Sequence, residues 1–508
     1  MTKLSRGSLI VRSSIVRTVY LFSSIVIAFF MMPFLVHSLG QRYYGMWTLV
    51  ATIIGYYGYL DFGLSKAAQQ FMARAIGRKD DAEVNRIVAS AIAVFAVIGL
   101  MAFLVSLVIA ALAPVFLDNA VEAGRFRIVI TVLGLNVLLA FPMMAFNGLF
   151  SANFRFDVVV AIDLTKLIAR NLLIFYFVSQ GHSIVALAVI TTAVDFVGHA
   201  ARFLALRTLF PQVAVRRVNF ERALVRPMFN YGGKAFLHSL ADVLRFQVDS
   251  LVVTSFINLS AVTVYNIGGQ LVNYFRQLMG SILGVIVPLY AQYDAVEDRD
   301  GMRRAFRLSS KVATILSVLL GGAALVFGDA FIEIWMGPEF AESYSVLAIL
   351  VLGTVVHVSQ EPAIALAYGT ARHGAYARVA LLEGVINAAL SIVLVQVWGL
   401  RGVALGTTIP MLLSSLYILR YVTRFLECGF LAHAALQARI VLIGGLLHGG
   451  AWYLLTHFVV DSYLDLFLAA AVVVPVQSAI LWMSGLDRDE RITILSSVRG
   501  LLGGRGGA

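Results

Sequence analysis

The chain has 508 residues, of which 60% are hydrophobic and 13% are charged, and its formal net charge is +11. Soluble globular domains carry roughly 25% charged residues, so this composition excludes an ordinary water-soluble protein. The basic residues lie in short loops between apolar runs rather than in one patch with interleaved aromatic side chains, which argues against nucleic acid as a partner. The single cysteine, Cys428, cannot form an internal disulfide or a thiolate metal site, and we expect no metal centre.

Apolar runs of about 20 residues recur along the chain, the length that a helix needs to cross a hydrocarbon core about 30 Å thick. The sequence therefore predicts an all-α membrane protein with about 14 transmembrane helices. The predicted spans are residues 15–36, 44–64, 87–113, 128–150, 158–178, 183–207, 229–256, 262–290, 308–328, 345–368, 376–398, 402–422, 437–457 and 464–484.

Lysine and arginine concentrate in alternate loops, above all in residues 66–86, 207–226 and 299–311. The loop at residues 329–342, on the opposite side, carries acids and no bases. The basic residues expected on that side are Arg42, Arg125, Arg127 and Arg401. Because basic loops stay in the cytoplasm, this bias predicts that both termini are cytoplasmic.

The two halves of the chain share an order of spans and several matching positions about 221 residues apart, which indicates an internal duplication. The matches are Arg86 with Arg307, Pro142 with Pro362, Asp163 with Glu383, and Gly181 with Gly402. The predicted parts are a six-helix lobe at 1–210, a cytoplasmic linker at 211–228, a second six-helix lobe at 229–424, an extra helix pair at 437–484 and a cytoplasmic tail at 485–508.

Ionisable residues inside the predicted spans are candidates for function, because a charge at mid-bilayer costs at least about 2.5 kcal/mol. The span at 229–256 carries five of them, at spacings of 4, 4, 3 and 4 residues, within an arc of roughly 80° on one helix face. These five are Lys234, His238, Asp242, Arg245 and Asp249. Such a face cannot point at lipid and is expected to line an interior cavity.

Other predicted spans carry similar polar stripes. They comprise Asp163, Lys166 and Arg170; Asp195, His199 and Arg202; Asn266, Gln270, Asn273 and Gln277, with Arg276 on the same span; and Glu383 with Asn387. Two interpretations stay open. The charges can neutralise one another as structural pairs, as Asp163 and Lys166 would at i,i+3, or some of them can contact a substrate in a cleft between the lobes.

Four features near the N-terminus carry a resemblance to a known family. They are Gly40, the step Tyr44-Gly45-x-Trp47, the helix end Leu60-Asp61-x-Gly63, and Asn85-Arg86 after a basic loop. The segment 36–91 that contains them resembles the opening of bacterial polysaccharide-biosynthesis flippases of the Wzx type, which belong to the multidrug/oligosaccharidyl-lipid/polysaccharide exporter superfamily. The duplicated layout extends the resemblance more loosely along the chain.

The resemblance implies two six-helix bundles in a MATE-like V shape with a central cavity, two additional C-terminal helices, and a place in the bacterial inner membrane. It also implies transfer of undecaprenyl-diphosphate-linked oligosaccharides from the inner to the outer leaflet by alternating access, without an enzymatic step. Expected partners are that lipid-linked sugar, membrane lipid, and the polymerase and glycosyltransferases of the same pathway. Related lipid II flippases bind the diphosphate with basic cavity residues and the lipid tail with the last two helices.

The polar stripes offer residues for the roles that the resemblance implies, although no family motif aligns with them, so their assignment rests on the stripes. Lys166, Arg170, Arg245, Lys234 and Arg276 are the candidates for diphosphate binding. Asn266, Gln270, Asn273 and Asn387 are the candidates for sugar binding. No organic cofactor is expected, but Asp163, His238, Asp242, Asp249 and Glu383 are candidates for coupling to protons or sodium.

Three alternatives compete with this interpretation. An ion-coupled multidrug exporter would share the architecture, but it would favour an acidic, aromatic cavity, whereas acids and bases balance here. A membrane polymerase or ligase would carry a long catalytic periplasmic loop, and no loop between the predicted spans exceeds about 25 residues. A scaffolding protein would have no use for charged stripes inside its spans.

Overall fold

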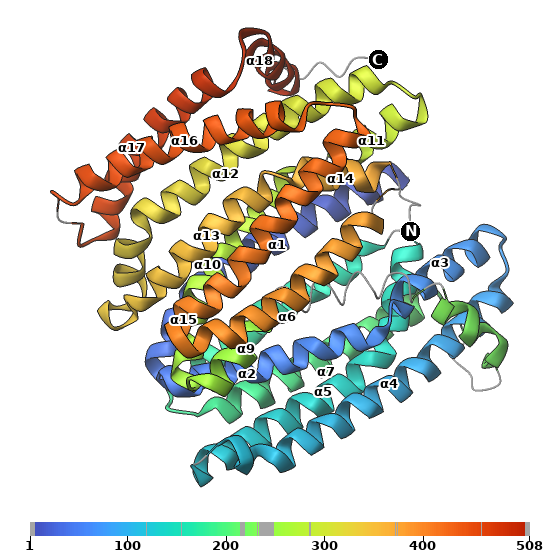
Figure 1. Cartoon of the computed structure of the whole chain (residues 1–508). Coiled ribbons are helices and arrows are strands. Elements are labelled where there is room, and N and C mark those ends of the chain that lie inside the picture. The colour runs from blue at the N-terminus through green and yellow to red at the C-terminus, as the bar shows by residue number, and fades with distance from the viewer. Residues whose placement is uncertain are drawn as a thin grey trace. The chain divides into compact units, whose positions relative to one another are not determined.

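The computed structural model (Figure 1) describes residues 6–117, 119–153, 155–213, 219–230, 232, 248–283, 286–370, 372, 374–458 and 460–502. Throughout these ranges every regular element is a helix, which confirms the predicted all-α membrane fold. Nine of the described helices are long and apolar enough to cross a membrane, and the bent pair of α13 and α14 would make a tenth. The chain is therefore a multi-pass membrane protein.

Most helices coincide with predicted spans. They are α1 (Arg6–Leu39), α2 (Gln41–Tyr57), α4 (Asp81–Phe116), α5 (Ala120–Ala152), α6 (Phe156–Ser179), α7 (Ile184–Leu209), α9 (Asp249–Phe256), α10 (Leu259–Leu283) followed by α11 (Ile286–Ala295), α12 (Arg299–Met336), α13 (Glu342–Val358) followed by α14 (Glu361–Gly369), α15 (Gly374–Phe425), α16 (Phe430–Leu455) and α17 (Tyr463–Gly485). The remaining elements are the short helix η1 (Gly58–Asp61), α3 (Leu64–Gly77), η3 (Pro338–Phe340) and α18 (Arg488–Leu502).

The chain divides into two compact units. Unit 1 comprises Met1–Val243 and Asn258–Thr263, and unit 2 comprises Leu244–Ile257 and Val264–Ala508. In unit 1, α5 packs between α4 and α7, and α6 packs against both α1 and α7. In unit 2, α12 packs against α13, α16 and α17, and α15 packs against α9 and α13.

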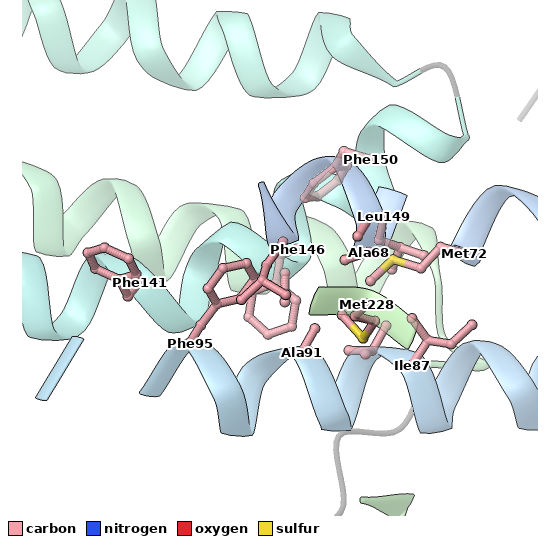
Figure 2. Close-up of a cluster of buried hydrophobic side chains, with 14 of the residues drawn as sticks. Ala68, Met72, Ile87, Ala91, Phe95, Phe141, Phe146, Leu149, Phe150 and Met228 are labelled. Atoms are coloured by element: carbon pink, nitrogen blue, oxygen red, sulfur yellow. The ribbon is translucent and has the colours of Figure 1, made fainter. Parts of the chain in front are cut away.

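The core of unit 1 contains a helix in a segment whose basic residues predict a loop. Residues 66–86 were expected to be a loop, but α3 occupies Leu64–Gly77. Its Ala68 and Met72 are buried against Phe146 and Leu149 of α5 in one hydrophobic cluster (Figure 2). The basic residues of α3 lie on its opposite, more exposed face, so counting charges alone concealed an amphipathic helix.

A helical hairpin in unit 2 joins two predicted spans within α15. The backbone of Gly399, with φ 55° and ψ −133°, departs from helical geometry at the point between residues 376–398 and 402–422. Glycine allows a close approach just after this turn, because a Cβ on Gly402 would lie 2.1 Å from the carbonyl oxygen of Leu394. A Cβ on Gly406 would likewise lie 2.3 Å from Oγ of Ser391. The two arms of α15 therefore pack tightly against each other.

A buried lysine ties the C-terminal helix α18 to α12. Lys311 is 1% exposed, although its place in the basic segment 299–311 predicts an inner loop. Its Nζ lies 3.0 Å from Oδ2 of Asp487 and 2.7 Å from Oε2 of Glu490. These ion pairs hold the start of α18 against α12, beside the end of α17, and we call them the Lys311 clamp.

The apolar side chains on the outer faces of the helices remain exposed. Leu172 of α6 is 64% exposed and Leu446 of α16 is 79% exposed. In water such surfaces would drive aggregation, but in a bilayer lipid tails cover them.

Candidate functional site

A cluster of charges in unit 1 forms where α6 and α7 pack together. Asp163 and Lys166 lie on α6, and Asp195 and Arg202 lie on α7. Nζ of Lys166 lies 2.7 Å from Oδ1 of Asp195 and 3.7 Å from Oδ1 of Asp163. Arg202 donates a close hydrogen bond to Asp163 through its Nη2. Two acids and two bases thus compensate one another inside the membrane domain.

Neighbouring side chains hold this α6–α7 charge cluster in place. Asn136 of α5 donates a 2.8 Å hydrogen bond from Nδ2 to Oδ2 of Asp195. Gly198 of α7 makes room for the lysine, since a Cβ there would lie 2.3 Å from Cδ of Lys166. His199 is 9% exposed, and neither ring nitrogen has a hydrogen-bond partner within the described part of the chain. The cluster is therefore built by three helices.

Arg170 differs from the other bases of this region. It lies one helical turn beyond Lys166 on α6 and is half-buried. Its charge acts on Asp195 electrostatically, but no hydrogen bond or ion pair joins its guanidinium to any described residue. Lys166 is engaged by two acids, whereas Arg170 has no such partner among the described residues.

A second polar cluster, in unit 2, surrounds Asp249 at the start of α9. Tyr265 of α10 donates a 2.5 Å hydrogen bond to Oδ2 of Asp249, and Thr407 of α15 donates one of 3.0 Å to the same oxygen. Asp249 is 8% exposed, and its Oδ1 is buried without a hydrogen-bond partner among the described residues. The carboxylate therefore presents one unsatisfied oxygen to the interior.

The α15 hairpin supplies further oxygens to this Asp249 cluster. Oδ1 of Asn387, on the first arm, lies 3.0 Å from the Ser391 hydroxyl and 3.2 Å from the Thr407 hydroxyl of the second arm. The carbonyl oxygen of Val403 lies 3.3 Å from the same two hydroxyls, each of which has one proton to share among these acceptors. One carboxylate, one amide, several hydroxyls and a main-chain carbonyl are thus gathered together, and hard cations prefer such oxygen ligands.

The other residues predicted for the site fall at several places. Glu383 is 3% exposed and lies one turn before Asn387 on α15. Asn387 itself is buried in the Asp249 cluster rather than displayed beside the amides of α10. Of the α10 residues, Asn266, Gln270 and Arg276 are half-buried and Asn273 is exposed. Lys234, His238, Asp242 and Arg245 lie outside the described residues.

The residues that sequence reasoning missed are uncharged. Asn136, Tyr265, Ser391 and Thr407 contact the predicted acids or Asn387, but single hydroxyls and amides inside apolar runs hardly change hydropathy. Helical spacing could have identified one of them, because Ser391 lies four residues after the predicted Asn387 and therefore on the same helix face.

An apolar groove of about 730 Å³ runs between α16 and α17. Leu446, Gly450, Leu454, Leu468 and Val472 line it, with Asp465 and Gln477 as polar residues along its length. A groove of this size and lining can hold part of a hydrocarbon chain.

Solved transporters share this fold. The chain superposes on a structure described as the lipid II flippase MurJ in an inward closed conformation with a TM-score of 0.70, at 16% identity, covering 92% of this chain and 98% of that one. An inward-facing multidrug resistance MATE family transporter of the MOP superfamily gives a TM-score of 0.62 at 14% identity, covering 79% of this chain and 98% of that one. The fold is therefore that of the MATE and MurJ class.

The chain belongs to the polysaccharide biosynthesis protein family, whose pattern matches residues 39–345, more than half of its length. It is 20% identical to a putative O-antigen transporter of Shigella flexneri over 77% of this chain and 92% of that protein. It is also 20% identical to a probable low-salt glycan biosynthesis flippase, Agl15, of Haloferax volcanii over 43% of this chain and 46% of that protein. The family resemblance seen in the sequence is thereby confirmed.

Proposed function

We propose that this protein is a flippase that carries undecaprenyl-diphosphate-linked oligosaccharides from the inner to the outer leaflet of the bacterial inner membrane, by alternating access. Membership in the polysaccharide biosynthesis family and the names of its relatives support a lipid-linked sugar as the cargo. The structural observation that carries the proposal is Arg170, a half-buried cation without an ion-pair partner in the described part of a membrane domain. A buried charge is costly unless something pairs with it.

The diphosphate is the part of the cargo that fits Arg170. A guanidinium binds phosphate oxygens through charge-assisted hydrogen bonds, which are roughly twice as strong as neutral ones. The Lys166 ammonium lies on the same helix face but is held by Asp195 and Asp163, so we assign it to positioning. The amides of Asn266, Gln270 and Asn273 offer donors and acceptors to sugar hydroxyls, and the α16–α17 groove offers an apolar surface to the polyprenyl tail.

The Asp249 cluster is the proposed coupling site. The unsatisfied Oδ1 of Asp249 can take up a proton or, together with the oxygens of Asn387, Thr407 and Val403, coordinate sodium. Because the ligands come from α9 and from both arms of the α15 hairpin, occupation of the cluster stabilises one arrangement of these helices. The cation gradient would then favour one direction of transport.

Deletion of the gene tests the proposal in cells. We expect the deletion strain to lose surface polysaccharide and to accumulate its lipid-linked oligosaccharide, and a plasmid copy to restore both. A strain that keeps normal surface polysaccharide would count against the flippase function. If the strain instead becomes sensitive to cationic drugs while its polysaccharide is unchanged, the chain is an exporter of the multidrug type. Reporter fusions at both ends test their proposed cytoplasmic location.

A further inference from the structure

A second cavity in unit 2, of about 870 Å³, opens where α13 begins and the α15 hairpin turns. Glu342 and Ser345 of α13 line one wall, and Trp398 and Arg401 of the hairpin turn line another. The predicted topology places this end of the unit on the outer side of the membrane, because the acidic loop at residues 329–342 leads into α13. The cavity is distinct from the α6–α7 charge cluster and from the Asp249 cluster.

The polar side chains that line this outer cavity form no hydrogen bonds or ion pairs with other described side chains. Within the described residues, no side-chain hydrogen bond or ion pair is made by Glu342, Ser345, Trp398 or Arg401. The carboxylate and the guanidinium line the same cavity without pairing with each other. The indole of Trp398 is 55% exposed. Donors, an acceptor and an aromatic face are therefore all free to bind a ligand from outside.

The backbone explains why the aromatic and basic side chains are displayed at the turn. Gly399 adopts a positive φ of 55°, and the chain reverses direction there between the two arms of α15. Trp398 and Arg401 flank this glycine at the tip of the hairpin, where neither arm covers them. The close packing at Gly402 and Gly406 fixes the arms, so the turn presents its side chains from a rigid support.

The chemistry of the cavity selects among ligand classes. The carboxylate of Glu342 would repel an anionic ligand, and the guanidinium of Arg401 would repel a cationic one. A polyhydroxyl ligand suits both residues, since hydroxyl groups donate to the carboxylate and accept from the guanidinium. The face of Trp398 offers an apolar platform for the ring of a sugar. A volume of about 870 Å³ lies within the range of small-ligand sites, which is about 300 to 1,000 Å³.

We propose that this cavity, lined by Glu342, Ser345, Trp398 and Arg401, is a carbohydrate-binding site that receives the glycan on the outer side of the membrane. The inference rests on the proposed function for the origin of the sugar. Binding at the outer end would hold the glycan after its lipid has crossed and would disfavour its return. The alternative is that Trp398 and Arg401 only anchor the hairpin in the membrane interface.

Cysteine protection tests the location and the ligand together. Because Cys428 is the single cysteine, the full chain with Cys428→Ser and Ser345→Cys carries one thiol, in the cavity. The probe is the oligosaccharide released by mild acid from the surface polysaccharide of the producing strain, applied to spheroplasts with a membrane-impermeant maleimide. At a probe concentration ten times Kd, occupancy should slow labelling about tenfold. The matched control, Cys428→Ser with Asp461→Cys, places the thiol in the exposed loop before α17 and should be labelled at an unchanged rate.

Substitutions separate sugar binding from anchoring. Trp398→Ala should weaken sugar binding about tenfold or more, the effect of losing a well-packed aromatic contact. At the same probe concentration this reduces the slowing of labelling at position 345 from about tenfold to about twofold or less, and Trp398→Phe should keep most of the protection. Trp452→Ala removes a similarly exposed tryptophan from α16 and should leave protection intact. Labelling that saturating oligosaccharide does not slow, or a thiol at position 345 that the outside reagent cannot reach, would overturn the inference. Deletion of the gene tests the flippase function separately, so the two failures are distinguishable.

Discussion

Lys166 of α6 and Asp195 of α7 form an ion pair of 2.7 Å, and the same lysine lies 3.7 Å from Asp163 on its own helix. The lysine therefore bridges two acids that would otherwise repel each other inside the membrane. Asn136 binds the second oxygen of Asp195, which fixes the carboxylate. Lys166 is thus engaged by two acids, whereas we propose that the neighbouring Arg170 binds the substrate.

Removal of Lys166 should destabilise the protein. Lys166→Ala leaves Asp195, whose side chain is 17% exposed, without its closest counter-charge, which typically costs on the order of 3 kcal/mol. The double variant Lys166→Met with Asp195→Asn removes both charges and should recover much of that loss. Thermal unfolding of the purified variants measures the difference. A single variant as stable as the wild type, or a double variant less stable than the single one, would contradict the structural role.

Arg170→Ala should instead damage transport while leaving the fold intact. Arg170 makes no ion pair within the described residues, so its truncation should change stability by less than about 1 kcal/mol. Loss of a charge-assisted hydrogen bond to phosphate should slow transport about 10- to 100-fold. Surface polysaccharide measured in complemented deletion strains reports the effect, with Arg170→Lys expected to retain part of it. Full activity of Arg170→Ala would remove this residue from the site.

Gly198→Ala should disturb the α6–α7 charge cluster without altering any charge. The added Cβ would lie 2.3 Å from Cδ of Lys166, so the lysine must move away from Asp195, at a cost of about 1 to 3 kcal/mol. Gly124→Ala is the control, since a Cβ there meets nothing within 4 Å, and it should stabilise its helix by up to about 1 kcal/mol. Equal melting temperatures for the two variants would argue against the tight packing at Gly198.

Asp249→Asn should abolish coupling to the cation. If sodium binds only the folded protein, a sodium concentration of 100 times Kd stabilises the fold by about 2.7 kcal/mol. The melting temperature of the wild type should then be higher in sodium chloride than in choline chloride. If the cation is a proton, transport by the wild type should depend on pH instead. Asp249→Asn should lose whichever dependence the wild type shows, and Asp461→Asn, an exposed control, should keep it. A variant at Asp249 that keeps the wild-type dependence would rule out this cluster.

Removing the two acids of the Lys311 clamp should lower the stability more than removing the lysine does. Replacing both Asp487 and Glu490 by their amides leaves a lysine that is 1% exposed without a counter-charge, at a cost on the order of 3 kcal/mol. Lys311→Met removes the buried charge, and Asp487, which is 71% exposed, remains solvated, so that variant should lose less. Thermal unfolding and trypsin cleavage within α18 measure both variants. The reverse order of stability would contradict the clamp.

Acid should release the same clamp. The hydrogen bond and the charge of Lys311 lower the pKa of Asp487 below its ordinary value. A carboxylate with a lowered pKa contributes stability above the unfolded-state pKa, about 3.9 for aspartate, and loses it as the pH falls through the folded-state pKa. Tryptic sites in α18 should therefore be protected at neutral pH, and pepsin should cleave the region readily only when the pH is well below about 3.9, where the folded-state carboxyl is protonated as well. Lys311→Met should lack the pH-dependent part of this protection.

The positions of the helices could largely be predicted from the sequence, because lipid imposes long apolar runs with few alternatives. The departures are local. Gly399 sits between two predicted spans, but hydropathy does not reveal that its arms pack close enough to bring Ser391 beside Val403. The helix α3 was not predicted, because the basic residues on its exposed face are typical of a loop between spans.

The partners of the charged residues were harder to predict than the residues themselves. Asp163, Lys166 and Asp249 were identified as candidates because charges inside spans are rare. Spacing along one helix favoured Asp163 as the partner of Lys166, yet its closest acid is Asp195 of the next helix. Periodicity describes the face of a single helix, and only packing decides which faces meet.

Translocation in a reconstituted system tests the central claim most directly. The purified protein is placed in liposomes with a fluorescent undecaprenyl-diphosphate oligosaccharide, and the fraction of probe that an external glycosidase can cleave is followed over time. The proposal predicts that the wild type moves probe between leaflets far faster than protein-free liposomes do, and that Arg170→Ala does not. Equal rates with and without the wild-type protein, under imposed sodium and proton gradients alike, would contradict it.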